Sequence, residues 1–94
     1  MSIRVARGLL TRMRGLAFAP PGDPLEIPRC SSVHTFGMRY PLDLIWIDRE
    51  RRVVRIDRAV PRRRVRFCRG ARAVVEVEAG RADELLTGEG TVVS

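Results

Sequence analysis

The side chains best suited to chemistry gather in one segment, residues 30–43. Cys30, His34 and Asp43 supply a nucleophile, a base and an acid, the set that cysteine hydrolases use. Cysteine-histidine catalysis normally places its cysteine at a helix N-terminus or in a glycine-rich turn, and the sequence around Cys30 indicates neither. No residue is therefore assigned a catalytic role, and a cysteine-dependent hydrolase using Cys30 and His34 is kept as one hypothesis.

Asp43 lies between Leu42 and Leu44, inside the most apolar stretch of the chain. A buried carboxylate costs several kcal/mol unless it is paired or hydrogen-bonded, so Asp43 needs partners. Arg39 and the backbone N–H groups of the loop are the candidates. The structural interpretation is that Asp43 fixes the loop to the strand.

The functional interpretation of the same segment is a polar binding surface. The residues that would form it are His34, Arg39, Tyr40 and Asp43. His34 is the only histidine, and its side chain is the one whose ordinary pKa lies near neutrality. The leading hypothesis is that the chain is a small non-catalytic binding or interaction module that uses this surface.

The basic residues concentrate in a second segment, residues 49–69, which holds ten arginines against Glu50 and Asp57. Its net charge is +8, although the whole chain carries +7. The densest part is Arg62, Arg63, Arg64 and Arg66. Clustered arginines can neutralise phosphates, so these four are the candidate site for a polyanion such as a nucleic acid. Phe67 is the one aromatic residue within this run, and a strand edge protected by charge is the preferred explanation of the run.

The composition sets limits on everything else. Ninety-four residues, of which 45% are hydrophobic and 31% charged, make one globular domain, residues 1–94. Cys30 and Cys68 are too far apart for a CxxC pair or a four-ligand zinc site, so no metal or cofactor is expected. No export signal or membrane span is evident, which predicts a cytoplasmic protein. The charge map favours an acidic protein, a polyanion or a second copy of the chain as partner.

The pattern of apolar residues predicts mostly strands. Leu9, Leu10, Met13 and Leu16 follow a helical spacing, which predicts one short N-terminal helix over residues 8–16. The prolines within residues 19–29 predict a loop. Strand patterns then cover residues 3–5, 42–47, 53–60, 64–68, 71–79 and 91–93, with a polar turn at 48–52. The fold class predicted is mainly β, a small antiparallel sandwich or barrel with that one helix.

The string His34-Thr-Phe-x-Met38-x-x-Pro41-Leu-Asp43 resembles the DUF192 family of small uncharacterised proteins. Arg14-Gly15-Leu16 and the stretch from Val75 to Gly80 add to the similarity, which covers roughly residues 8–90. The resemblance implies a compact, mainly β, sandwich-like fold. It implies no activity, ligand or catalytic residue. The turn at 48–52 departs from the family pattern because it lacks the usual glycine, which argues against a tight type I′ hairpin.

Overall fold

The computed structural model describes residues 3–5, 24–35, 38 and 40–92. Their strands are β1 Arg4–Val5, β2 Leu25–Pro28, β3 Ser32–His34, β4 Leu42–Ile47, β5 Val53–Val60, β6 Val65–Phe67 and β7 Ala73–Glu78, followed by a 3₁₀ helix, η1 Ala82–Leu85. Five strands form one sheet in the order β1-β2-β7-β4-β5, and β3 pairs with β6 in a second sheet. Only β1 and β2 pair in parallel within the described residues. The mainly β, antiparallel prediction is confirmed. The predicted helix over 8–16 lies outside the described residues.

Strand β4 forms the centre of the molecule because both of its faces are covered. All six of its residues are buried, as its sequence predicts, since every residue except Asp43 is apolar. Leu42, Leu44 and Trp46 belong to a first core, against which Val33 of β3 also packs. Ile45 belongs to a second core on the opposite face, which includes Leu85 of η1 and Val92. The larger sheet is therefore enclosed between two apolar layers.

The turn between β4 and β5 is built by a carboxylate instead of a glycine. The Asp48 side chain accepts hydrogen bonds from the backbone N–H groups of Glu50 and Arg52, each at 2.9 Å. Arg51 takes the left-handed backbone conformation, with φ of 63°, and its guanidinium lies 3.0 Å from the Glu26 carboxylate of β2. The hydrogen bonds to Asp48 and the ion pair of Arg51 with Glu26 offset the strain of a non-glycine residue in that conformation.

The loop predicted for residues 19–29 is wrong over its last part, because Leu25–Pro28 is strand β2, which lies between β1 and β7. Leu25 and Ile27 are buried, whereas Glu26 and Pro28 are half-buried. This two-residue alternation marks a strand, and the flanking prolines obscured it. Pro28 is tolerated because it is the last residue of the strand, beyond the pair of residues that β1 contacts.

At the C-terminal end, the strand predicted for 91–93 is reduced to two isolated bridges. Thr91 pairs with Arg52 and Val92 pairs with Leu86. Val93 lies outside the described residues.

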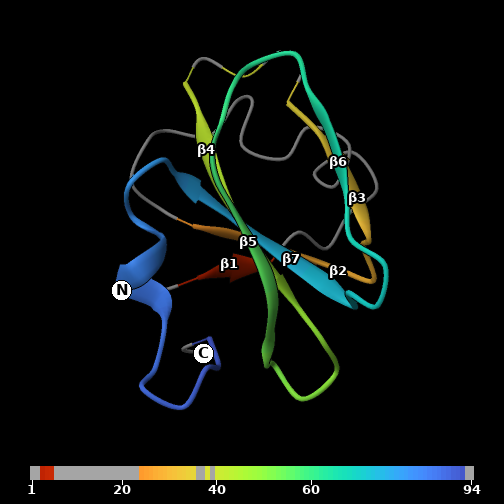
Figure 1. The fold of residues 1–94 in the computed structure, drawn as a ribbon, viewed down its shortest axis with the longest axis vertical. Coiled ribbons are helices and arrows are strands. Elements are labelled where there is room, and N and C mark those ends of the chain that lie inside the picture. Colours follow the sequence, from red (N-terminus) through yellow and green to blue (C-terminus); the bar gives the residue numbers. More distant parts are fainter. Residues whose placement is uncertain (1–2, 6–23, 36–37, 39, 93–94) are drawn as a thin grey trace.

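Figure 1 shows β3 and β6 side by side at the right of the view, with the chain passing from the end of β5 over the top into β6. The loop 61–64 therefore lies at the opposite end of β5 from the Asp48 turn.

Candidate functional site

The predicted ligand-binding residues of segment 30–43 occupy different environments. His34 is exposed in β3, and Tyr40 is half-buried against the first core. Asp43 in β4 is only 1% exposed. Arg39 lies outside the described residues. The fold thus presents His34 to solvent and places Asp43 in the interior.

Asp43 uses both carboxylate oxygens to hold backbone N–H groups from three places in the chain. Oδ1 accepts from Ala59 at 2.8 Å, and Oδ2 accepts from Gly80 at 3.0 Å and Ala82 at 3.1 Å. The donors are backbone N–H groups, but they belong to β5, to Gly80 and to η1, and not to the loop before β4 that the sequence suggested. Ala59 has φ of 51° and lies where the pairing of β4 with β5 shifts register. Asp43 therefore stabilises an irregular part of β5 and the start of η1 together.

The nucleophile, base and acid set is not assembled in the described residues. Asp43 faces the second core, as shown by its bond to Ala82, whereas Cys30 packs on the first core across the sheet. The Cys30 thiol donates to the backbone oxygen of Ser32 at 2.9 Å. Asp43 is consequently in no position to orient His34, and any chemistry of Cys30 would proceed without this carboxylate.

Thr35 joins the two segments that the sequence presents separately. It is 1% exposed, and its hydroxyl donates to the Pro61 oxygen at 2.7 Å and accepts from the Arg64 N–H at 2.8 Å. Its backbone N–H donates to the Arg64 oxygen at 2.8 Å, and its carbonyl accepts from the Arg63 N–H at 3.3 Å. One threonine therefore fixes the arginine loop 61–64 beside β3. No local sequence pattern indicates these long-range partners, so the role of Thr35 cannot be predicted from the sequence.

Eight of the described arginines fall into two groups that differ in their partners. Arg51, Arg55, Arg58 and Arg81 each form an ion pair with an aspartate or glutamate. The side chains of Arg62, Arg63, Arg64 and Arg66 contact no carboxylate among the described residues. Arg64 and Arg66 instead donate to backbone oxygens of their own segment. The positive charge of this loop is thus not neutralised by the described part of the protein.

The outer face of the β3–β6 sheet brings His34 next to the arginine segment. The register pairs His34 with Val65 and Ser32 with Phe67. Cross-strand partners lie on the same face of a sheet, and all four of these residues are exposed. Val65 is 60% exposed and Phe67 is 71% exposed. The surface predicted in segment 30–43 and the one predicted around Arg62 are therefore parts of one surface.

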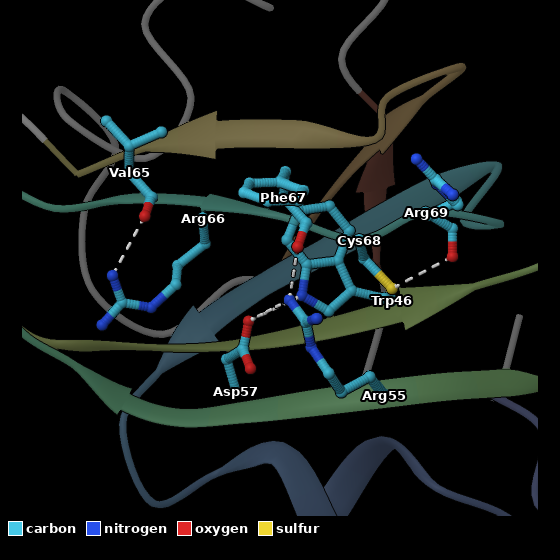
Figure 2. Close-up of polar contacts among 8 residues, drawn as sticks. All are labelled: Trp46, Arg55, Asp57, Val65, Arg66, Phe67, Cys68 and Arg69. Atoms are coloured by element: carbon cyan, nitrogen blue, oxygen red, sulfur yellow. Dashed lines mark hydrogen bonds and ion pairs between the residues drawn. The ribbon is translucent and has the colours of Figure 1, made fainter.

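A groove of about 350 Å³ lies between residues of β5 and β6, and it includes Val65 and Phe67 of the outer face. Its lining residues are Arg55, Asp57, Val65, Arg66 and Phe67. Figure 2 shows the Asp57 carboxylate facing both the Trp46 indole and the Arg55 guanidinium, which lie on the same side of it. The indole N–H donates to Asp57 Oδ2 at 3.0 Å, and Arg55 Nη2 donates to the same oxygen at 2.8 Å.

Arg55 also connects the two sheets. Its Nη2 donates to the Phe67 backbone oxygen at 2.6 Å, and its guanidinium lies 5.7 Å from the centre of the Trp46 ring. The hydrogen bond to Asp57 is the main cause that raises the pKa of Arg55 above its ordinary value. Arg55 is therefore a structural cation, whereas Arg66 presents its charge at the groove.

The described residues contain no cluster of three histidine, cysteine, aspartate or glutamate side chains arranged like metal ligands. In the same part of the chain, no helix combines the length and apolar character needed to cross a bilayer. What the arrangement offers chemically is a cationic loop beside an exposed face that carries one histidine and one phenylalanine.

A family model named DUF192 and described as Uncharacterized ACR matches residues 1–94, the whole chain. The chain belongs to the DUF192 family. A crystal structure of a protein of unknown function from Novosphingobium aromaticivorans DSM 12444 is similar to this DUF192 chain, with a TM-score of 0.72 and 23% identity. The match covers 85% of this chain and 64% of that protein, so the chain spans less than two thirds of its neighbour's length. No curated protein matches the DUF192 chain.

Proposed function

We propose that residues 1–94 form a single non-catalytic binding module that recognises a polyanion on the surface where segment 30–43 meets the arginine loop. The observation that carries the proposal is the Thr35 anchor. It holds Arg63 and Arg64 beside β3, and these arginines meet no described carboxylate. Protection of a strand edge accounts for Arg66 within β6, but Arg62, Arg63 and Arg64 precede the strand. Because like charges repel, an external anion accounts for the position of these three.

The residues of the module have separate roles in this proposal. Arg62, Arg63, Arg64 and Arg66 contact the anionic groups, since guanidinium forks match phosphate, sulfate and carboxylate oxygens. His34 and Tyr40 contribute from the adjoining segment, as does Arg39. Asp43 is a positioning residue, because its oxygens are occupied by backbone donors in the interior. Neither a metal nor a cofactor is required.

The mechanism predicts a strong dependence on salt. Binding that neutralises four anionic groups releases about three to four counterions, so a plot of log K against log salt has a slope of roughly −3. We propose to titrate the protein with a heparin oligosaccharide, a polyanion without bases, between about 50 and about 200 mM salt. A slope near zero contradicts the proposal.

A matched pair of variants locates the site. R62A/R63A removes two exposed arginines from the loop, whereas R49A/R52A removes two exposed arginines from the turn at the other end of β5. Each pair lowers the net charge equally. The loop variant is expected to reduce the magnitude of the salt slope by about 2, roughly one per arginine, and the turn variant to change it much less. Equal losses from both variants would show attraction by net charge without a site, and would refute the proposal.

A cysteine-dependent hydrolase using Cys30 and His34 is the competing function. It predicts that Cys30 reacts with a thiol-directed acylating probe faster than Cys68, which is 4% exposed. Equal, slow labelling of both thiols argues against the hydrolase and leaves the binding proposal standing.

A further inference from the structure

The outer face of the β3–β6 sheet carries exposed apolar surface that serves no core. Val65 and Phe67 are more than half exposed, and their cross-strand partners His34 and Ser32 are exposed beside them. The inner face, which carries Val33, supplies the packing against the first core. A large exposed ring among charged residues is unfavourable in water, so this face is a candidate contact surface.

The free edge of β6 is blocked against an added strand. Thr35 N–H donates to the Arg64 oxygen and Cys68 N–H donates to the Ser31 oxygen, so the even-numbered residues of β6 pair with β3. By alternation, the backbone groups of Val65 and Phe67 point away from β3. Their carbonyls already accept from Arg66 Nη1 at 3.0 Å and from Arg55 Nη2 at 2.6 Å. A peptide that added a strand to β6 would need these acceptors, so β-augmentation at this edge is disfavoured.

A ligand of this face must therefore contact its side chains, which are two planar rings flanked by arginines. Phe67 and His34 are planar rings on one face, and as diagonal neighbours of an antiparallel pair they are about 7–8 Å apart. Arg62, Arg63 and Arg64 follow at the His34 end, where Thr35 anchors the loop, and the exposed Arg69 follows at the Phe67 end. Planar rings between cations match a chain of bases that alternate with phosphates.

We propose that this face binds single-stranded nucleic acid, with one base stacked on Phe67, a neighbouring base on His34, and the phosphates along the arginine loop and Arg69. The inference rests on the proposed polyanion function and names its ligand class. A duplex fits poorly, because its bases already stack on one another and must be unstacked first at a cost of a few kcal/mol.

The experiment compares two ligands that carry the same phosphates. Oligothymidylate of about 12 nucleotides, within the range of single-strand site sizes, presents bases. An abasic strand of the same length presents none. The wild-type protein is expected to bind the base-bearing strand at least about 5-fold more tightly, the lower limit expected for a single stacked base. Equal affinity for both strands overturns the inference, but salt-dependent binding of heparin would still support the polyanion function.

Variants at position 67 separate stacking from simple apolar contact. F67W keeps a stacking ring and is expected to retain the preference for oligothymidylate. F67L keeps apolar bulk without the ring and is expected to lose it, by about 5-fold or more. V65A is the matched control, because Val65 is a similarly exposed apolar neighbour on the same face, and its preference is expected to be unchanged. Because Phe67 is 71% exposed and Val65 is 60% exposed, all three variants are expected to fold like the wild type.

Two further results would overturn the inference. If F67L binds oligothymidylate as tightly as the wild type, the face is an apolar contact and not a stacking platform. If an oligoglutamate peptide binds as tightly as oligothymidylate and loses affinity in F67L, the ligand is an acidic peptide. H34A is expected to weaken binding of oligothymidylate more than binding of the abasic strand, because only the base-bearing strand can stack on the imidazole. Equal losses for the two strands would contradict stacking on His34.

Discussion

Replacing Asp43 by asparagine keeps the shape of the side chain but removes its charge and one of its acceptors. In the native protein Oδ1 serves Ala59, and Oδ2 serves Gly80 and Ala82. An amide has one oxygen, so the best orientation keeps the Gly80 and Ala82 bonds and turns the NH₂ group toward the Ala59 N–H. Two donors then face each other inside the protein.

The expected loss follows from counting these bonds. A buried N–H without an acceptor costs about 1–3 kcal/mol, and a bond that changes from a charged to a neutral acceptor loses about 1 kcal/mol. One lost bond and two weakened bonds amount to about 3–5 kcal/mol. The neutral amide is also less costly to bury than a carboxylate, which offsets part of this loss. We therefore expect D43N to lower the free energy of unfolding by about 3 kcal/mol. A domain of this size has about 5–14 kcal/mol of stability in total, so the variant still folds.

Urea unfolding measures this loss, followed by the fluorescence of Trp46, the only tryptophan, which is completely buried. With a slope of about 1.5 kcal/mol per M, the midpoint should fall by about 2 M. The control is D83N, the same chemical change at an exposed residue whose partner is the exposed Arg58. If D43N is no less stable than D83N, Asp43 does not hold the three segments together. Folded D43N should bind heparin as the wild type does, and a selective loss of binding would instead make Asp43 a ligand contact.

Two further pairs of variants test the Thr35 anchor of the surface and the backbone strain at Gly80. T35V removes the hydroxyl that binds Pro61 and Arg64. It should lower the free energy of unfolding in urea by about 1–3 kcal/mol and reduce the salt slope of heparin binding. T35S keeps the hydroxyl and should show the wild-type stability and slope; identical behaviour of the two variants would show that the hydroxyl does not anchor the loop. G80A should cost about 1–3 kcal/mol from backbone strain alone, because Gly80 has φ of 94° and open space at its Cβ position. G88A, at a site with the same open space and no positive φ, should be nearly neutral, and a loss equal to that of G80A would contradict this explanation.

The central strands could be predicted because their signals are local. The apolar run of β4 and the alternation of β7 both predict strands, and the bounds of the β4–β5 hairpin match the structure. The alternation of β7 predicts one exposed face, whereas the fold buries both faces of this strand. Strand β2 was missed because only two buried residues, Leu25 and Ile27, distinguish it, and its prolines are stronger local signals for a loop. Local pattern succeeds where one strand carries enough apolar residues to identify itself.

The candidate site could be predicted only in pieces, because its assembly depends on register. Residues 30–43 and 62–66 were each expected as a separate surface. They become one through the pairing of β3 with β6 and through the Thr35 hydroxyl. A shift of one residue in that pairing would place His34 and Phe67 on different faces. No local sequence pattern specifies a register between strands so far apart in the chain.

The string from His34 to Asp43 therefore combines two tasks that substitution can separate. Thr35 and Asp43 are each 1% exposed, and each satisfies backbone groups from distant segments. His34 points from the same string to the exposed face. Because buried polar groups contribute to stability through several bonds at once, whereas an exposed ring contributes little to it, loss at Thr35 or Asp43 should appear first as instability. Loss at His34 should appear only in the affinity for a ligand, which is how the two roles are to be distinguished in any member of the family that carries this string.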